Sequence, residues 1–291
     1  MILIDYSQVA VAGILAFSAD IKKNSNADEK RNLIRHVVLS TIKSYKKKYG
    51  KEYGQMVIAC DGRNYWRKEY FANYKGLRKK AREASDLDWN MIFETLSEIR
   101  EDLKEHFKYK VVHVDRCEAD DVIAILTENT QEFGQYEPVM IVSSDKDFKQ
   151  LHAYDNVKQF SPMLKKLITI TSKKELNAWL IEHIVKGDAG DGVPNIMSSD
   201  NCLMDGIRQK SIRAERLEEF IKLGFNACKT DEERRNWQRN STLVDFKYIP
   251  EDVKKTILDA FEVEPKGSKM AIMNYLMKHR CRLLLDDIED F

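Results

Sequence analysis

The chain has 291 residues, which is enough for one large domain or two modest ones. Its formal net charge is only +1 although 33% of its residues are charged, so any binding surface must come from how those charges are distributed. Five cysteines without a CxxC pair exclude a disulfide framework, and no apolar run approaches the length of a membrane span. The start of the chain lacks a basic-then-apolar leader, and we therefore expect a soluble, cytoplasmic monomer that does not bind membranes.

The first part of the chain alternates predicted strands and helices. Residues 1–5 and 55–60 are predicted as strands. A helix from about residue 8 and an amphipathic helix over roughly 29–49 lie between them. The stretch 63–106 is long, polar and favourable for helices, and it contains no obvious strand.

The rest of the chain continues this alternation and then becomes helical. Further strands are predicted at 110–114, 138–143 and 156–160, a β extension at 164–170, and helices at 117–132 and from the Ser172 capping box to about 186. No convincing strand follows residue 187. The pattern predicts an α/β fold with a central, mostly parallel sheet over residues 1–186, a helical arch at about 63–106, and an all-helical region over 187–291.

Seven acidic residues stand where a predicted strand ends or a predicted helix begins. They are Asp5, Asp61, Glu118, Asp120, Asp145, Asp147 and Asp191. An apolar run that ends in Asp is typical of a buried parallel strand, and open α/β sheets place their sites at the edge where such strands end. Converging carboxylates need cations because close like charges raise one another's pKa. Hard divalent ions, Mg²⁺ above all, are the natural counter-charge, and two of them would clamp both sides of an in-line phosphoryl displacement.

A basic arm follows directly after Asp61. Residues 63–82 contain eight Lys and Arg residues against one acid, Glu69, with five aromatic residues interleaved. Basic side chains attract phosphates, and aromatic rings can stack on splayed bases. The alternative is a solvated helical face whose rings pack inward. The position beside the acidic cluster favours nucleic-acid binding.

The segment 187–195 is rich in turn-forming residues, and turns of this kind can bind a phosphate through backbone N–H groups. Alone, it could equally be an ordinary loop between domains. The six histidines show no ligand spacing with one another, so the sequence indicates neither a zinc site nor a histidine-based nucleophile.

Together these motifs resemble the structure-specific 5′-nuclease (flap endonuclease) superfamily over almost the whole chain, and within it the ribonuclease H or 5′→3′ exonuclease group of T-even-like phages. The resemblance rests on five motifs in order: a strand ending in Asp5, a strand ending in Asp61 before the basic arm, Glu-Ala-Asp-Asp at 118–121, Ser-Ser-Asp-x-Asp-Phe-x-Gln-Leu at 143–151, and Gly-Asp-x-x-Asp at 187–191.

The resemblance implies a nuclease with two Mg²⁺ ions, for which Mn²⁺ can substitute. It implies a first group of metal ligands (Asp5, Asp61, Glu118 and Asp120), a second group (Asp145, Asp147 and Asp191) and two accessory acids (Asp121 and Asp188). Lys75 and Arg67 are expected to contact the scissile phosphate, so the predicted catalytic residues are Lys75, Arg67, Asp120 and Asp145.

In the family, the basic arm resembles an arch through which a 5′ single strand passes, and the turn after Gly187 begins a helix–three-turn–helix element that grips duplex DNA. The implied nucleic-acid contacts are Arg63, Tyr65, Arg67, Tyr74, Lys75, Arg78, Lys79, Lys80, Arg82, Lys210 and Ser211. The chain departs from the family pattern at Gly192, at Asn195 and in the intervening residues 196–205. This departure leaves open whether the element holds a monovalent cation.

The implied function is the removal of RNA primers and 5′ flaps during replication in a phage-infected bacterium. The implied substrates are RNA/DNA hybrids and branched or nicked duplexes with a 5′ flap. The acidic tail 286–291 resembles sliding-clamp-binding peptides, although a helix end that packs on its own domain explains it equally well; a single-strand-binding protein is a further expected partner. The rival functions are a single-strand ribonuclease of the related PIN type and a catalytically weak, structure-specific DNA-binding protein.

Overall fold

A computed structural model describes residues 1–24, 26–78, 83, 86–170 and 172–291. Three of the predicted nucleic-acid contacts, Lys79, Lys80 and Arg82, lie outside these residues. Within the described part of the chain, no helix combines the length and the apolar character needed to cross a membrane.

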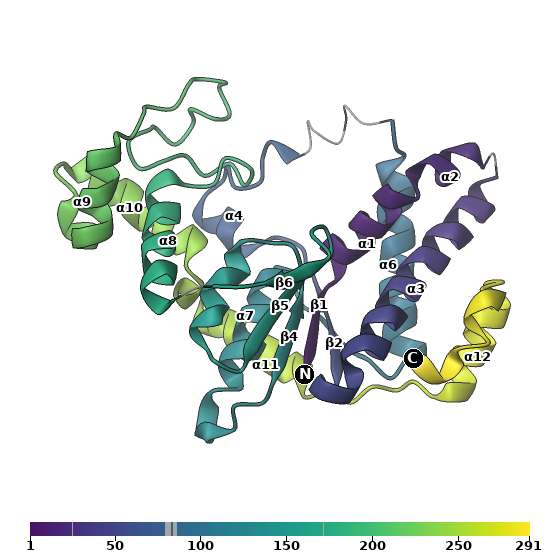
Figure 1. The fold of residues 1–291 in the computed structure, drawn as a ribbon. Helices are drawn as coiled ribbons and strands as arrows, with labels where there is room; N and C mark the ends of the chain where they lie inside the picture. Colours follow the sequence, from purple (N-terminus) through teal and green to yellow (C-terminus); the bar gives the residue numbers. More distant parts are fainter. Residues whose placement is uncertain (25, 79–82, 84–85, 171) are drawn as a thin grey trace.

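A six-stranded sheet in the order β3-β2-β1-β4-β5-β6 lies at the centre of the molecule (Figure 1). The strands are β1 (Ile2–Asp5), β2 (Met56–Cys60), β3 (Lys110–His113), β4 (Val139–Val142), β5 (Val157–Ser161) and β6 (Lys166–Ile168). The first five are parallel, and β6 runs antiparallel to β5. The chain extends the sheet to one side of β1 and then, from β4 on, to the other. This reversal creates a switch point beside β1, where open sheets bind ligands.

Helices cover both faces of the sheet because β1, β2 and β4 are apolar on both faces. One face packs against α1 (Tyr6–Ala16), α3 (Ala27–Tyr53), α6 (Trp89–His106) and α12 (Lys269–Lys278), and the other packs against α7 (Ala119–Asn129) and α11 (Glu251–Phe261). Ile2 and Ile4 point to the first face and Leu3 to the second, as the two-residue period of a strand requires.

A third apolar cluster lies among α8 (Lys173–Lys186), α9 (Ala214–Leu223) and α10 (Asp231–Val244), seen to the left of the sheet in Figure 1. Phe220 and Trp237 stack in this cluster with their ring centroids 5.7 Å apart. No strand follows Gly187 within the described residues 187–291, apart from one isolated bridge between Asp188 and Val193. The predicted mostly parallel sheet and the helical C-terminal region are therefore confirmed.

Several short elements complete the fold. They are the helices α2 (Ser18–Lys23) and α4 (Trp66–Tyr70) and the 3₁₀ helices η1 (Glu132–Gly134), η2 (Asp147–Ala153), η3 (Gly224–Ala227), η4 (Phe246–Tyr248), η5 (Arg282–Leu284) and η6 (Ile288–Asp290). The sequence did not predict α2. Helix α1 starts two residues earlier than expected because Asp5 caps it, with the backbone N–H of Gln8 donating to Asp5 Oδ1 at 3.1 Å.

Candidate active site

Four of the predicted acids line one hollow of about 400 Å³. Asp5 ends β1, Asp61 follows β2, Asp145 lies just beyond β4, and Asp120 stands in the first turn of α7. Parallel strands end at the same edge of a sheet, so three of these carboxylates come from adjacent strand ends. The N-terminus of α7 supplies the fourth, where the helix dipole favours an acid.

The carboxylates in the hollow oppose one another's ionisation. Asp5 is buried and accepts hydrogen bonds from Gln8 N at 3.1 Å and Ser143 Oγ at 2.9 Å. Its burial and the neighbouring charge of Asp61 nevertheless raise its pKa to about 7. Burial and Asp145 likewise raise the pKa of Asp120 well above its ordinary value. A site of this kind favours bound cations, because they relieve the repulsion.

Glu118 lies behind the hollow, fully buried between basic side chains. It accepts hydrogen bonds from Arg67 Nη1 at 3.0 Å, from Tyr74 Oη at 3.0 Å and from Lys75 Nζ. Burial alone would raise its pKa, but the Lys75 ammonium and the Arg67 guanidinium outweigh burial and hold the pKa of Glu118 below its ordinary value. Glu118 is thus ionised in a dry environment.

Arg67 and Asp121 form the layer beneath Glu118. Arg67 is 3% exposed and donates to Asp121 at 2.7 Å as well as to Glu118. Asp121 also accepts from the indole of Trp66 and from the backbone of Glu118, so both of its carboxylate oxygens have protein partners. In this geometry Arg67 and Asp121 support the site from below and do not line the hollow.

The base of the arm is joined to the turn after Gly187. Lys75 N donates to Asp191 O at 2.7 Å, and Tyr74 Oη, which shares its one proton with Glu118, lies 3.2 Å from the Asp191 carboxylate. Gly192 has a φ of 74°, and a Cβ built on it would lie 2.6 Å from Asn73 O. Only glycine fits this approach, which accounts for one departure from the family pattern.

A second group of acids lies at the C-terminal end of α8 and includes a histidine of that helix. His183 Nε2 is 2.9 Å from Asp147 Oδ1 and 3.8 Å from Asp188 Oδ2. One ligand atom from each of these three residues lies within 4.8 Å of the others, so the group could hold a metal ion. Spacing along the sequence did not reveal His183 as a ligand, because 36 residues separate it from Asp147.

The predicted nucleic-acid residues divide between the hollow and the surface. Tyr65, Lys75 and Arg78 line the hollow beside the acids. Arg63 is exposed and does not line the hollow, and Lys210 and Ser211 are exposed on the loop that joins α8 to α9. The arm and the loop after Gly187 thus both carry basic groups outside the hollow or at its edge.

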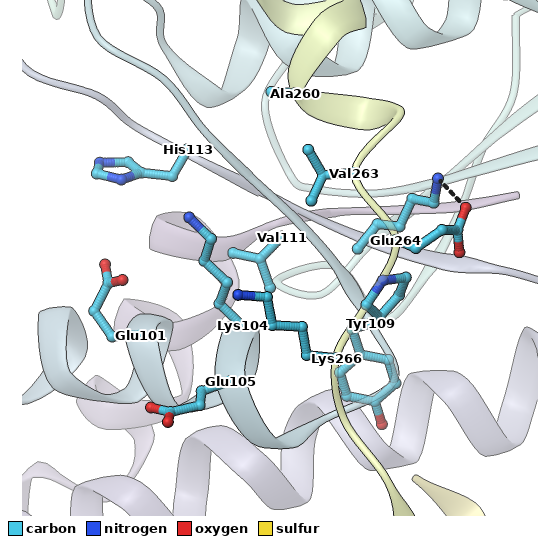
Figure 2. Close-up of a pocket in the computed structure, with 12 residues that line it drawn as sticks. Glu101, Lys104, Glu105, Tyr109, Val111, His113, Ala260, Val263, Glu264 and Lys266 are labelled. Atoms are coloured by element: carbon cyan, nitrogen blue, oxygen red, sulfur yellow. Dashed lines mark hydrogen bonds and ion pairs between the residues drawn. The ribbon is translucent and has the colours of Figure 1, made fainter.

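Another hollow, of about 370 Å³, lies among α6, β3 and the segment after α11 (Figure 2). Lys104 and Lys266 project into it, together with Glu101 and Glu105. It contains none of the predicted metal ligands, so it is not a candidate for the metal-dependent active site.

An acid-lined hollow at the switch point of a parallel sheet, flanked by buried and exposed basic groups, defines a metal-dependent phosphodiester hydrolase of the α/β class. Residues 1–180 match the family model for the 5′-3′ exonuclease N-terminal resolvase-like domain, and residues 174–291 match the model for the C-terminal part of T4 RNase H. The chain belongs to the 5′-3′ exonuclease family, in its T4 ribonuclease H-like branch. The predicted superfamily and enzyme class are confirmed.

Individual relatives agree with this assignment. The ribonuclease H of Enterobacteria phage T4 is 33% identical over an alignment of 301 positions, which covers 99% of this chain and 95% of the T4 protein. The exodeoxyribonuclease of Enterobacteria phage T3 is 28% identical over 198 residues, 67% of this chain and 61% of the T3 protein. The T5 5′-exonuclease with bound zinc has the same fold, with a TM-score of 0.62 at 19% identity over 90% of this chain and 98% of that one.

Proposed function

We propose that this protein removes RNA primers and short 5′ flaps during DNA replication, using two Mg²⁺ ions that Mn²⁺ can replace. The observation that carries the proposal is the hollow in which Asp5, Asp61, Asp120 and Asp145 converge beside Lys75. The T4 relative is a ribonuclease H, and a T5 flap endonuclease of the same fold was solved in complex with DNA and metal ions. RNA/DNA hybrids and duplexes with a 5′ flap are therefore the proposed substrates.

The donor set of the site fits hard divalent cations. The side chains around the hollow offer carboxylate oxygens, which are the ligands that Mg²⁺ and Mn²⁺ accept. Ions bound there would supply Lewis-acid stabilisation on both sides of an in-line displacement. We propose two ligand groups, with Asp121 and Asp188 in supporting positions. The first group is Asp5, Asp61, Glu118 and Asp120, and the second is Asp145, Asp147 and Asp191.

The basic residues have separate roles in this proposal. Lys75 lines the hollow and contacts Glu118, so its ammonium is placed to stabilise negative charge on a reacting phosphate. Arg78 lies beside it and pairs with Asp191. Arg67 is buried, and it acts by holding Glu118 ionised and in position.

Duplex DNA would bind along the loop that carries Lys210 and Ser211, while the arm would receive the 5′ single strand. Both surfaces neutralise phosphates, so binding should weaken steeply as salt rises, and it should depend on shape and a free 5′ end more than on base sequence.

A sliding clamp and a single-strand-binding protein are further proposed partners, and the tail bears on the first. Phe291 packs edge-on against Phe107 with ring centroids 5.3 Å apart, and Lys43 Nζ lies 2.6 Å from Asp287 Oδ2. These contacts support the alternative in which the tail packs on its own domain. A clamp that captured residues 285–291 would first have to detach them from α3 and α6.

Cleavage of a 5′-labelled flap duplex and of a matched RNA/DNA hybrid, with Mg²⁺ and with EDTA, tests the proposal. We expect metal-dependent cutting near the junction or from the 5′ end, whereas a PIN-type ribonuclease would cut single-stranded RNA and spare the DNA flap. The double variant Asp145→Asn and Asp147→Asn should lose cleavage and still bind flapped DNA. Tight binding by a wild-type protein that cuts neither substrate would favour the structure-specific binding protein.

A further inference from the structure

One wall of the acid-lined hollow is aromatic. Trp89 and Phe93 lie one turn apart at the start of α6, and both line the hollow with the acids. Their rings stack with centroids 5.6 Å apart and an interplanar angle of 29°. Phe93 remains 42% exposed, so the stacked pair presents ring surface to the hollow and is not merely core packing. Tyr65, from the arm, lines the same hollow.

Two polar atoms at this hollow are buried without hydrogen-bond partners among the described residues. They are Gln8 Oε1, an acceptor on α1, and Trp89 Nε1, a donor on α6. Both residues line the hollow. Leaving a buried polar atom unpaired costs roughly 1–3 kcal/mol, so such atoms are rare unless a ligand or water completes them.

We propose that this wall is a nucleobase subsite, and the proposal rests on the nuclease function given above. A phosphate held by Lys75 and by cations bound to the acids would place an attached nucleotide inside the same hollow, whose volume of about 400 Å³ suits a ligand of that size. A base has a flat face that can pack against the exposed Phe93 ring, and its edge carries acceptors and donors that Trp89 Nε1 and Gln8 Oε1 lack as partners. The subsite therefore holds the base of a nucleotide next to the scissile phosphate. Stacking of this kind tolerates any base, which suits an enzyme that does not read sequence.

The test compares protein variants with substrate variants. Phe93→Ala removes the exposed ring, and Trp89→Phe keeps a ring but removes the N–H donor. Tyr136→Ala is the matched control, because Tyr136 is 61% exposed and precedes β4 at the opposite edge of the sheet. Each protein is tested on a 5′-flap duplex in natural form and with an abasic residue at each nucleotide flanking the scissile phosphate. Binding is measured by anisotropy in EDTA and single-turnover cleavage in Mg²⁺, after melting curves confirm folding.

At one of the two positions, we expect the abasic residue to weaken wild-type binding or slow cleavage about tenfold, the range of one base stack. Phe93→Ala should cause a similar loss on the natural flap and no further loss on the abasic flap; Trp89→Phe should show a smaller loss of the same kind. Tyr136→Ala should match the wild type. Equal losses on natural and abasic flaps, or no loss with Phe93→Ala, would overturn the subsite while leaving the nuclease intact. Absence of cleavage by the wild type would instead reject the proposed function. The comparison of binding by the protein variants to natural and abasic flaps in EDTA would still show whether the aromatic wall contacts a base.

Discussion

At the scale of single residues, Lys75 is held in an unusual position. Its φ is 55°, which is uncommon for a residue other than glycine, and its side chain is only 10% exposed, with the ammonium against Glu118. Strained backbone tends to persist where the surroundings fix a functional side chain. Here the fixing contacts are the bond from Lys75 N to Asp191 O and the close approach of Gly192.

We expect Lys75→Ala to lower the single-turnover cleavage rate by at least about tenfold, because a preorganised charge at the reacting phosphate contributes through the transition state. Lys51→Ala, on the exposed end of α3, is the matched control and should leave the rate unchanged. An unaltered rate with Lys75→Ala would mean that this lysine does not act on the reacting phosphate and has only a structural role.

The raised pKa of Asp5 predicts a dependence of stability on pH. Burial and Asp61 raise this pKa from 3.8 to about 7, so the folded protein binds the proton more tightly than the unfolded chain does. The resulting stabilisation is complete below about pH 4 and is lost as the pH rises through 7. In EDTA, Asp5→Asn should therefore be more stable than the wild type at pH 8, by at least about 1 kcal/mol, and lose that advantage near pH 4.

Urea unfolding at the two pH values measures this difference, and Asp205→Asn, on an exposed loop, controls for the loss of one negative charge. Added Mg²⁺ at pH 8 should stabilise the wild type more than Asp5→Asn. If Asp5→Asn is less stable than the wild type at pH 8, the ionised Asp5 carboxylate does not destabilise the metal-free protein as we infer.

At the scale of elements, the contact between the arm and the 187–195 turn controls the geometry of the site. Phe71 and Tyr74 from the arm pack with Val193 and with Leu243 of α10 in a small apolar cluster of their own. The same junction carries the bond from Lys75 to Asp191. A change that separates the two segments should therefore disturb both the packing and the position of Lys75.

Gly192→Ala should be such a change. Its Cβ would lie 2.6 Å from Asn73 O at a φ of 74°, and we expect a loss of at least about 2 kcal/mol in the free energy of unfolding, with slower cleavage. Gly206→Ala separates the cost of the positive φ from the cost of the close approach to Asn73. Gly206 has a similar φ of 68° but nothing within 4 Å of its Cβ position. It should show only the backbone cost, about 1 kcal/mol, and a near-normal rate. Equal effects of the two changes would mean that the close approach to Asn73 is unimportant.

At the scale of the whole molecule, the last two helices, α11 and α12, pack on the sheet and not with α8, α9 and α10. Val253 and Ile257 of α11 belong to the apolar cluster on one face of the sheet, and Ile272 and Leu276 of α12 belong to the cluster on the other. After α10 the chain thus returns to the α/β region, where α11 packs on one face of the sheet and α12 on the other. The tail then packs against α3 and against Phe107, which follows α6.

Deleting residues 285–291 should lower the melting temperature, since Ile288 and Phe291 pack on the core and their loss costs about 2 kcal/mol. A matched variant that keeps the length but neutralises two acids of the tail (Glu289→Gln and Asp290→Asn) should melt close to the wild type, because their ion pairs with Lys269 and Lys47 are partly or largely exposed and such pairs contribute little. Clamp stimulation that disappears on deletion, without any change in melting, would favour the clamp-binding peptide instead.

Much of the fold was predictable because the decisive signals are local. Buried parallel strands are nearly continuous apolar runs, and each predicted strand is present within one or two residues of its expected bounds, except that β6 is shorter than the extension predicted at 164–170. Ser172 caps α8 through the backbone N–H of Glu175, as its capping pattern predicts. The acids at the ends of β1, β2 and β4 follow from the same reasoning, since parallel strands must deliver them to one edge.

The sequence by itself therefore determined the order of the functional segments along the chain. These are the acids at the strand ends, the basic arm after the second strand, and the glycine-rich turn before the helical region. Only the tertiary structure decided which of these groups meet. It buried Arg67 beneath Glu118, brought His183 to Asp147, and placed Trp89 and Phe93 in the same hollow as the acids. The physical reason is that local periodicity fixes an element and the direction of its side chains, whereas contacts between residues distant in sequence depend on how complete elements pack.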